Sequence, residues 1–340
     1  MTPTKEEPTV DMSNEARVEV ASGDFLDVRR FSVKQAMSRL FRVEVQAVSR
    51  SLNVDFTQVI GKEASFALGT VLSRQTWRGV CVAIDQVKVE AGHLATYTLT
   101  IAPRAVLMTH RKNYRIFQYE SEIAIVTRLL AEWGVPHRVS VDGAVHKPRK
   151  FRVQYGESDF TFMCRMLEDA GISFWFEDAG GETTMVLGDE PQTADVTHPS
   201  LQFFDNPQVA TGDFVTKLAL GRRVRPGAMT IGDIDYRRAR GQQPRLSAAA
   251  GLSQESRLEQ FDHEPGAFLY QNTGGAGGST PFADDRGSTR TDEAAGDRKT
   301  KNRLLGKRQD AQTVRLESNV LTLAPGVIFS VFDHPHAALA

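Results

Sequence analysis

The stretch that decides the fold is QYGESDFTFMCRMLEDAGISFWF, residues 154–176. After Ser158, a residue type that caps helix N-termini, apolar side chains recur at helical spacing until Gly171, which favours a helix end. The predicted apolar stripe is Phe160, Met163, Cys164, Leu167 and Ala170. Residues 172–177 then alternate between apolar and polar, which predicts a strand. Because only one turn separates the two elements, four side chains are expected to be buried together: Phe160, Leu167, Phe174 and Phe176.

A second helix is predicted upstream, between a Ser121 cap and a terminating Gly134. Its apolar positions follow the helical period at Ile123, Val126, Leu129, Leu130 and Trp133. Downstream, residues 184–187 are the expected hairpin partner of the strand at 172–177. Two helices and a hairpin together predict an α+β unit over residues 108–200.

Short alternating segments precede this unit, as in residues 41–47 and 95–101. Apolar residues fall on even positions at Val80, Val82 and Ile84 and on odd positions at Val87 and Val89, which indicates a bulge near Asp85 and Gln86. Cys81 falls on an odd position before this bulge and is therefore expected on the outer face. Strands at this spacing predict a first antiparallel β-barrel over residues 15–107.

The remaining chain reads as a weaker β pattern over residues 201–340. It is interrupted at about 273–300 by a stretch rich in Gly, Ser, Thr, Asp and Arg, which is predicted to be a mobile loop. The polar N-terminus, residues 1–14, is predicted to be a disordered tail. Mainly β structure with an inserted α+β unit is therefore the expected fold class.

Composition excludes several classes of protein. The formal net charge of −1 lacks the basic surplus of a nucleic-acid binder. The sequence contains no apolar run of about 18 residues, so stable membrane insertion is not expected. The N-terminus also lacks the apolar core of a signal peptide. Two cysteines cannot form a disulfide framework, which fits assembly in the reducing cytoplasm.

Catalytic and metal-binding motifs are incomplete, so no cofactor, no metal and no enzyme activity are predicted. Gly61-Lys62 lacks the Ser or Thr of a phosphate loop, and His263-Glu264 runs into a proline that breaks the helix of a metalloprotease motif. His334 and His336 form a close pair, but zinc normally takes three or four protein ligands.

Other reactive or charged side chains have simpler interpretations. Cys164 lies on the predicted apolar helix face and reads as a small buried hydrophobe. Glu168 and Asp169 share a helix with Arg165, which favours a solvated ion-pair face over a catalytic carboxylate pair. The arginines at 222, 223 and 225 precede a proline and indicate a solvated turn.

With these residues in view, the chain resembles the VgrG family of spike proteins over residues 15–336. Residues 154–176 carry the specific part of the resemblance, and residues 114–118, 41–62 and 323–335 support it. We refer to the matching positions as the signature residues: Gln154, Glu157, Ser158, Phe162, Arg165, Leu167, Gly171, Phe174 and Phe176.

The resemblance implies a non-enzymatic component of the type VI secretion spike. It implies two tube-type antiparallel β-barrels with the α+β insertion between them, and a homotrimer that adapts a three-fold spike to a hexameric Hcp tube. Residues 15–107 and 201–340 should then share one barrel topology. The C-terminal needle region of the family, through which tip protein and effectors are carried, is absent from this sequence. Export would follow cytoplasmic assembly, by contraction.

Two alternatives remain at this point. The first is the equivalent hub of a phage-tail-like contractile particle, which shares the expected fold. The second is a spike-borne cell-wall hydrolase, which would need an acid of raised pKa and a second carboxylate at a fixed separation.

Overall fold

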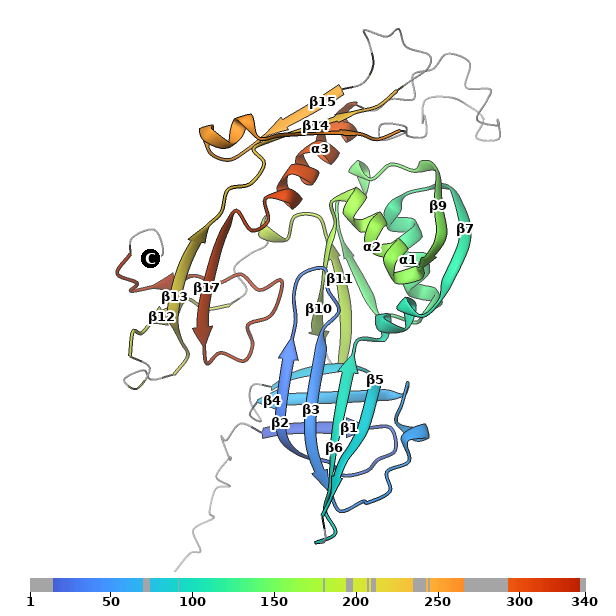
Figure 1. Cartoon of the computed structure of the whole chain (residues 1–340), viewed down its shortest axis with the longest axis vertical. Helices are drawn as coiled ribbons and strands as arrows, with labels where there is room; N and C mark the ends of the chain where they lie inside the picture. Colours follow the sequence, from blue (N-terminus) through green and yellow to red (C-terminus); the bar gives the residue numbers. More distant parts are fainter. Residues whose placement is uncertain are drawn as a thin grey trace, which may run out of the picture.

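The computed structural model in Figure 1 describes most of the chain between residues 15 and 336. The described residues are 15–69, 74–90, 92–179, 181–193, 198–206, 208, 212–234, 243, 245–265 and 293–336. The predicted tail at 1–14 and residues 273–292 of the predicted mobile loop lie outside these ranges. The first β unit, the α+β unit and the C-terminal unit follow one another in the sequence, and in space each of them lies beside the other two.

Six antiparallel strands form the first sheet, in the order β1-β4-β5-β6-β3-β2. Their bounds are β1 Glu15–Val20, β2 Asp27–Lys34, β3 Arg42–Ser49, β4 Glu63–Gly69, β5 Arg74–Val89 and β6 Ala95–Ala102. The sheet curves so strongly that its two edge strands, β1 and β2, come close to each other. Val43, Val45 and Ala47 of β3 are buried while the intervening residues are not, which confirms the predicted alternation.

The first sheet contains two bulges on β5, between Cys81 and Ala83 and between Gln86 and Lys88. The second lies beside the predicted position, and the first was not predicted. The prediction that Cys81 faces outward is wrong, because its side chain is buried and its Sγ lies 3.2 Å from the carbonyl oxygen of Ala83. A bulge at this position interrupts the alternation of inward and outward side chains, so the direction of Cys81 cannot be counted from Val80.

The α+β unit contains two small sheets and two helices. Strands β7 (Lys112–Glu120) and β9 (Arg149–Ser158) form an antiparallel ribbon, and β8 (His137–Ser140), β10 (Ser173–Ala179) and β11 (Glu182–Gly188) form a sheet in the order β10-β11-β8. The helices are α1 (Glu122–Glu132) and α2 (Asp159–Ala170). The predicted hairpin of β10 and β11 is confirmed.

The predicted helix ends in this unit are confirmed. The Ser121 and Ser158 hydroxyls accept hydrogen bonds from the N–H groups of Ala124 and Thr161, at 3.2 and 3.1 Å. Gly134 and Gly171 have φ of +59° and +72°, in the left-handed region that glycine adopts without steric cost.

Helix α2 buries a wider face than its predicted stripe. Its buried apolar residues are Phe162, Met163, Met166 and Leu167, whereas Phe160, Cys164 and Ala170 are only partly buried. The reason is that α2 contacts α1 and β9 as well as the following strand β10. Joint burial is confirmed for Leu167, Phe174 and Phe176, and Phe160 lies edge-on to Phe174 at the rim, with ring centroids 6.3 Å apart.

The C-terminal unit contains two separate sheets. The first has the order β17-β13-β12-β18, with β12 parallel to both its neighbours. The bounds are β12 Leu201–Phe203, β13 Phe214–Arg222, β17 Gln312–Ser318 and β18 Val331–Phe332. The second has the order β15-β14-β16, from β14 Ala228–Gly232, β15 Arg245–Ala249 and β16 Glu259–His263, and α3 (Glu293–Lys307) packs against it.

Two expectations for this unit are therefore wrong in the described part of the chain. It does not repeat the topology of the first sheet, because its strands divide into a mixed four-stranded sheet and a second, inserted sheet. Residues 293–300 are helical and not part of a mobile loop. Helix α3 was missed because it buries small or polar residues (Ala295, Gly296, Lys299 and Thr300) and only one leucine, Leu304, so it lacks an apolar stripe.

The helices in the described ranges do not include a candidate membrane span.

Candidate functional site

The signature residues lie on β9, on α2, at the turn after α2 and on β10. Figure 1 places these elements between the first sheet and the C-terminal unit. They make three kinds of contact: a polar network at the start of α2, a close approach of α3 to the turn, and contacts of β10 with both flanking units. We treat this junction as the candidate functional site.

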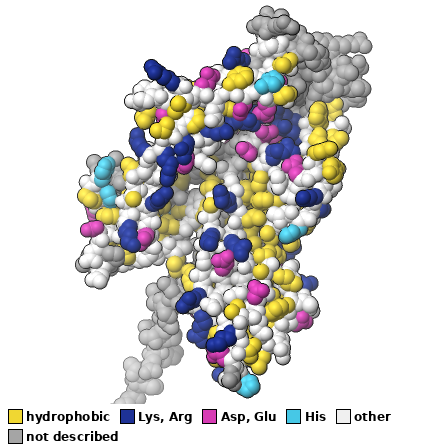
Figure 2. Space-filling model, in the orientation of Figure 1, with side chains coloured by type: hydrophobic (Ala, Val, Ile, Leu, Met, Phe, Trp, Pro, Cys, Tyr) yellow, Lys and Arg dark blue, Asp and Glu magenta, His cyan; other side chains and the backbone are white. Residues whose placement is uncertain are grey.

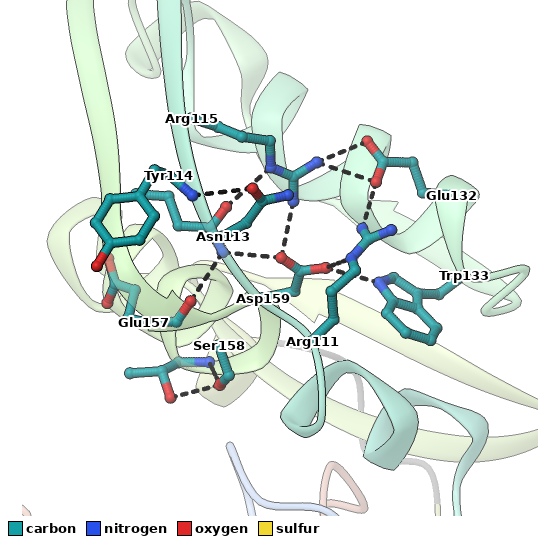
Figure 3. A network of polar contacts seen from close by, with 11 residues as sticks. Arg111, Asn113, Tyr114, Arg115, Glu132, Trp133, Glu157, Ser158 and Asp159 are labelled. Carbon is teal, nitrogen blue, oxygen red and sulfur yellow. Dashed lines mark hydrogen bonds and ion pairs between the residues drawn. The ribbon is translucent and has the colours of Figure 1, made fainter.

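The polar network has the carboxylate of Asp159 at its centre (Figure 3). Asp159 is the first residue of α2, and its side chain is completely buried. Four groups donate hydrogen bonds to it: Arg111 Nε at 2.6 Å, Arg115 Nη2 at 2.8 Å, Trp133 Nε1 at 2.9 Å and Gln154 Nε2 at 2.8 Å. A buried carboxylate needs such partners because its desolvation is costly.

The donors around Asp159 are themselves held in place. Gln154, which is fully buried, accepts a hydrogen bond from Arg115 Nε through its Oε1 at 2.9 Å. Glu132 pairs with both Arg111 and Arg115, and the Arg111 guanidinium lies 4.7 Å from the centroid of the Trp133 ring. The network therefore joins the ribbon β7–β9 to both helices.

The surrounding cations keep these carboxylates charged. Burial acts to raise the pKa of Asp159, but hydrogen bonds from Gln154, Trp133 and Arg111 outweigh it and hold that pKa below its ordinary value. Burial also acts to raise the pKa of Glu132, and the two arginines outweigh it in the same way. At neutral pH both groups are hydrogen-bond acceptors, and neither has the raised pKa of a general acid.

The next signature residues stabilise the N-terminal half of α2. Arg165 pairs with Glu157 and donates from Nη2 to the carbonyl oxygen of Val153 at 2.7 Å. Its guanidinium lies 5.2 Å from the centroid of the Phe162 ring. Phe162 in turn stacks on Phe117 of β7, with ring centroids 5.3 Å apart. These contacts fix α2 on the inner face of the ribbon.

The predicted solvated ion-pair face of α2 is wrong for Asp169. Its carboxylate lies within 3.0 Å of Arg152, 3.5 Å of Lys299 and 3.6 Å of Arg303, and Lys299 is itself buried. Burial acts to raise the pKa of Asp169, and Lys299 and Arg152 outweigh it, so this pKa is lowered. Since Lys299 and Arg303 belong to α3, these ion pairs join α2 to the C-terminal unit.

The turn at Gly171 contacts the same helix. A Cβ atom at this position would lie 1.9 Å from Nδ2 of Asn302 on α3. A side chain at position 171 would therefore be strained by the positive φ and would also have to displace the Asn302 side chain.

Strand β10 contacts both flanking units. The N–H of Ser38 donates to the carbonyl oxygen of Phe174 at 2.7 Å, and the Phe176 ring meets Phe41 edge-on, with centroids 5.3 Å apart. On the other side, a Cβ atom at Gly326 would lie 2.5 Å from Nε1 of Trp175. The signature segment thus positions the first sheet and the C-terminal loop relative to α2.

Sequence reasoning did not assign several residues to this junction, and it read Trp133 only as an apolar helix position. The others are Arg111, Arg115, Glu132, Asp159 and Asn302. An acidic residue directly after a Ser cap is a usable signal for Asp159, because the first helical turn favours negative charge. The arginines and Asn302 carry no local signal, since they meet Asp159 and Gly171 only in the folded chain.

Potential reactive groups elsewhere have ordinary surroundings. Burial, followed by the charge of Glu168, raises the pKa of the Cys164 thiol to about 11. His334 packs against Phe203, with ring centroids 4.5 Å apart, and its Nδ1 accepts a hydrogen bond from the N–H of His336 at 3.1 Å. Within the described ranges, no group of three or more His, Cys, Asp or Glu side chains is arranged to hold a metal ion.

Comparison with known proteins finds a match to one family and to curated relatives. Residues 34–340 match the family model of the phage tail baseplate hub (GPD). The type VI secretion system spike protein VgrG1a of Pseudomonas aeruginosa is 28% identical over 222 residues, covering 63% of this chain and 34% of that protein. The chain spans about a third of the length of the curated relatives that it matches.

Solved structures share the fold. The Escherichia coli c3393 protein, a type VI secretion component with structural similarity to the T4 bacteriophage tail proteins gp27 and gp5, matches with a TM-score of 0.66 at 16% identity, covering 95% of this chain and 68% of that chain. The 43 kDa tail protein of prophage MuSo2 from Shewanella oneidensis matches with a TM-score of 0.60 at 12% identity, covering 94% of this chain and 89% of that chain.

Proposed function

Because the chain belongs to the phage tail baseplate hub (GPD) family, we propose that it is the structural hub of a type VI secretion spike. In this proposal three copies form a ring that joins a three-fold spike to a hexameric Hcp tube. The identity to spike proteins of Pseudomonas aeruginosa supports the secretion system as the setting. Tip protein and effectors would be carried by the region that continues the family beyond the hub, and the assembled spike would leave the cytoplasm by contraction.

The structural observation that carries the proposal is that the carboxylates of the junction are paired with cations of the same chain. Asp159, Glu132 and Asp169 each pair with arginine or lysine of the same chain, and their pKa values are lowered. A cell-wall hydrolase would need one carboxyl group of raised pKa beside a second carboxylate. Within the described part of the chain this junction is built to hold three units together, which suits a component that transmits force.

A six-fold tube on a three-fold hub requires two similar binding surfaces in each chain. We propose that the six-stranded first sheet and the four-stranded sheet β17-β13-β12-β18 supply them, as two tube-type parts of the hub whose strand orders differ. The second sheet with α3 is then a further insertion, placed like the α+β unit outside the contact with the tube. The curvature of the first sheet supports a barrel there, and the four-stranded sheet would need to be completed in the assembly.

The proposed function is tested by the mass of the purified chain in solution and by its binding to the tube. We expect a three-copy species in native mass spectrometry, and co-sedimentation with Hcp tubes encoded beside the same gene. Hcp from an unrelated system is the matched control. A chain that stays single at every concentration and releases sugar from peptidoglycan would overturn the proposal in favour of the hydrolase.

A second candidate, the hub of a phage-tail-like particle, is supported by the match to the prophage tail protein, of which this chain covers 89%, against 68% of the c3393 protein. The same sedimentation experiment separates the two candidates. Binding to a phage tail-tube protein but not to Hcp would select the phage-type particle, and the reverse would select the secretion spike.

A further inference from the structure

The outer face of the ribbon β7–β9 carries a contiguous row of exposed apolar side chains. We call it the ribbon stripe, and its members are Tyr114, Ile116, Phe151 and Tyr155, which are 70%, 68%, 61% and 78% exposed. Tyr114 lies directly opposite Tyr155 in the ladder, and their rings meet edge-on with centroids 5.1 Å apart. In Figure 2, hydrophobic side chains gather at the right-hand edge, where Figure 1 places β7 and β9.

The ribbon stripe cannot turn inward, because the other face of the ribbon is already occupied. Phe117 and Gln154 on that face are buried against α2 and the Asp159 network. Single exposed apolar residues are ordinary on a protein surface, whereas a contiguous row that includes three aromatic rings is typical of an interaction site. The stripe is thus a rigid, outward-facing apolar surface.

A concave apolar surface lies between β2 and the C-terminal unit. We call it the C-terminal groove; its volume is about 730 Å³, and nine of its ten lining residues are apolar and none is charged. Its walls include Val33 of β2, Leu218 of β13, Val314 and Leu316 of β17, Phe329, and Val331 of β18. Val314 remains 49% exposed, so the described residues leave this wall of the groove uncovered.

We infer that the ribbon stripe of one copy occupies the C-terminal groove of the next copy in the ring. In Figure 1 the ribbon lies on the right and β13 and β17 on the left, with α2, β10 and β11 between them. The ribbon stripe of a chain therefore does not reach the groove of the same chain. Neither surface carries a charge, and an uncharged groove favours an uncharged occupant.

The symmetry of this contact fits an assembly of identical copies, and its size makes it one part of a larger interface. The three aromatic side chains are 61–78% exposed, so at about 200 Å² each they can still bury about 400 Å² together. That is about half of the roughly 800 Å² per partner of a stable interface. Two different faces that meet head to tail form a closed ring when the rotation between copies closes. The inference rests on the proposed function, because it names the contact through which the three copies join.

Two double variants test the inference in the full chain. The stripe variant is Ile116→Lys with Tyr155→Lys, and the groove variant is Val314→Lys with Leu316→Lys. A control, Val87→Lys with Val89→Lys, places the same charges on two other exposed apolar residues, which are 59% and 51% exposed. We expect the stripe and groove variants to remain single chains in native mass spectrometry, and the control to assemble as the unmodified chain does. Far-ultraviolet circular dichroism verifies that each variant is folded.

Mixing the two variants gives the decisive readout. Each retains one intact face, so an equimolar mixture should form a complex of two chains, one of each kind, and nothing larger. No complex in the mixture, or assembly of either variant alone into three copies, would overturn the stripe–groove contact while leaving the proposed hub intact. An unmodified chain that never assembles would overturn both the contact and the hub.

Discussion

The six-stranded first sheet and the four-stranded sheet of the C-terminal unit bury their apolar residues to different extents. Strands of the first sheet contribute Phe66, Tyr97 and Leu99 to one core that continues into both helices of the α+β unit. In β12, β13, β17 and β18, the buried hydrophobic residues are Leu201 and Val215, and neither belongs to a core cluster. The first sheet has a core within one chain, whereas the four-stranded sheet has few buried residues and leaves Val314 exposed.

This difference indicates where stability and assembly reside. A sheet with a filled core gains its free energy of folding from its own chain, while a sheet with an open apolar face gains it on association. The predictions below compare the closed part, made of the first sheet and the α+β unit, with the open four-stranded sheet.

The largest expected effect is the loss of the Asp159 carboxylate from the closed part. Asp159→Asn leaves Arg111 and Arg115 facing a neutral group and should lower the free energy of unfolding by about 3–5 kcal/mol, the usual cost of breaking a buried ion pair. Urea unfolding measures it. Asp27→Asn is the control, because its ion pair with Arg29 is exposed and contributes little. Equal effects of the two substitutions would contradict a structural role for the network.

Truncating one leucine in each part compares the two cores directly. Leu167→Ala in the closed core should cost about 2–5 kcal/mol. Leu316→Ala in the open sheet should cost about 1 kcal/mol in the single chain, because its side chain is not fully buried. Both values come from denaturant unfolding at a concentration where the chain does not assemble. A loss at Leu316 as large as at Leu167 would mean that the four-stranded sheet is already closed.

The turn between α2 and β10 gives a smaller effect with a built-in control. Gly134→Ala meets only backbone strain, since no atom lies within 4 Å of the added Cβ, and should cost about 1–2 kcal/mol. Gly171→Ala has the same strain and also displaces Asn302, so it should cost more. Adding Asn302→Ala should reduce the cost of Gly171→Ala to that of Gly134→Ala. If Asn302→Ala makes no difference, α3 does not rest on this turn.

Acidification should lower the free energy of unfolding of the closed part, by a smaller amount for each carboxylate than the substitutions above. Asp159, Glu132, Glu122 and Asp169 have lowered pKa values, so the unfolded chain binds more protons than the folded chain as the pH falls. Stability present above about pH 5 should therefore be lost towards lower pH. Asp159→Asn should reduce the slope by at most one proton, about 1.4 kcal/mol per pH unit. Unchanged slopes between pH 3 and 5 would show that Asp159 is not ionised in the folded chain.

Local patterns predicted the closed part well and the open part poorly. The caps at Ser121 and Ser158, the stop at Gly171 and the strand with Phe174 depend on residues a few positions apart, and the sequence displays them directly. Bulges change parity without a local signal, as at Cys81, and α3 buries Lys299 through partners on other elements. The contacts of Arg111 and Arg115 with Asp159 span more than 40 residues, so no periodic pattern predicts them.

The central claim is that the first sheet has a filled core within one chain and that the apolar face of the four-stranded sheet is covered on assembly. Amide hydrogen exchange, measured at a concentration where the chain is single and again in the three-copy species, tests it most directly. We predict that protection in β3 and β6 is the same in both states, and that protection in β13 and β17 rises on assembly. Equal protection of β13 and β17 in both states would contradict the claim.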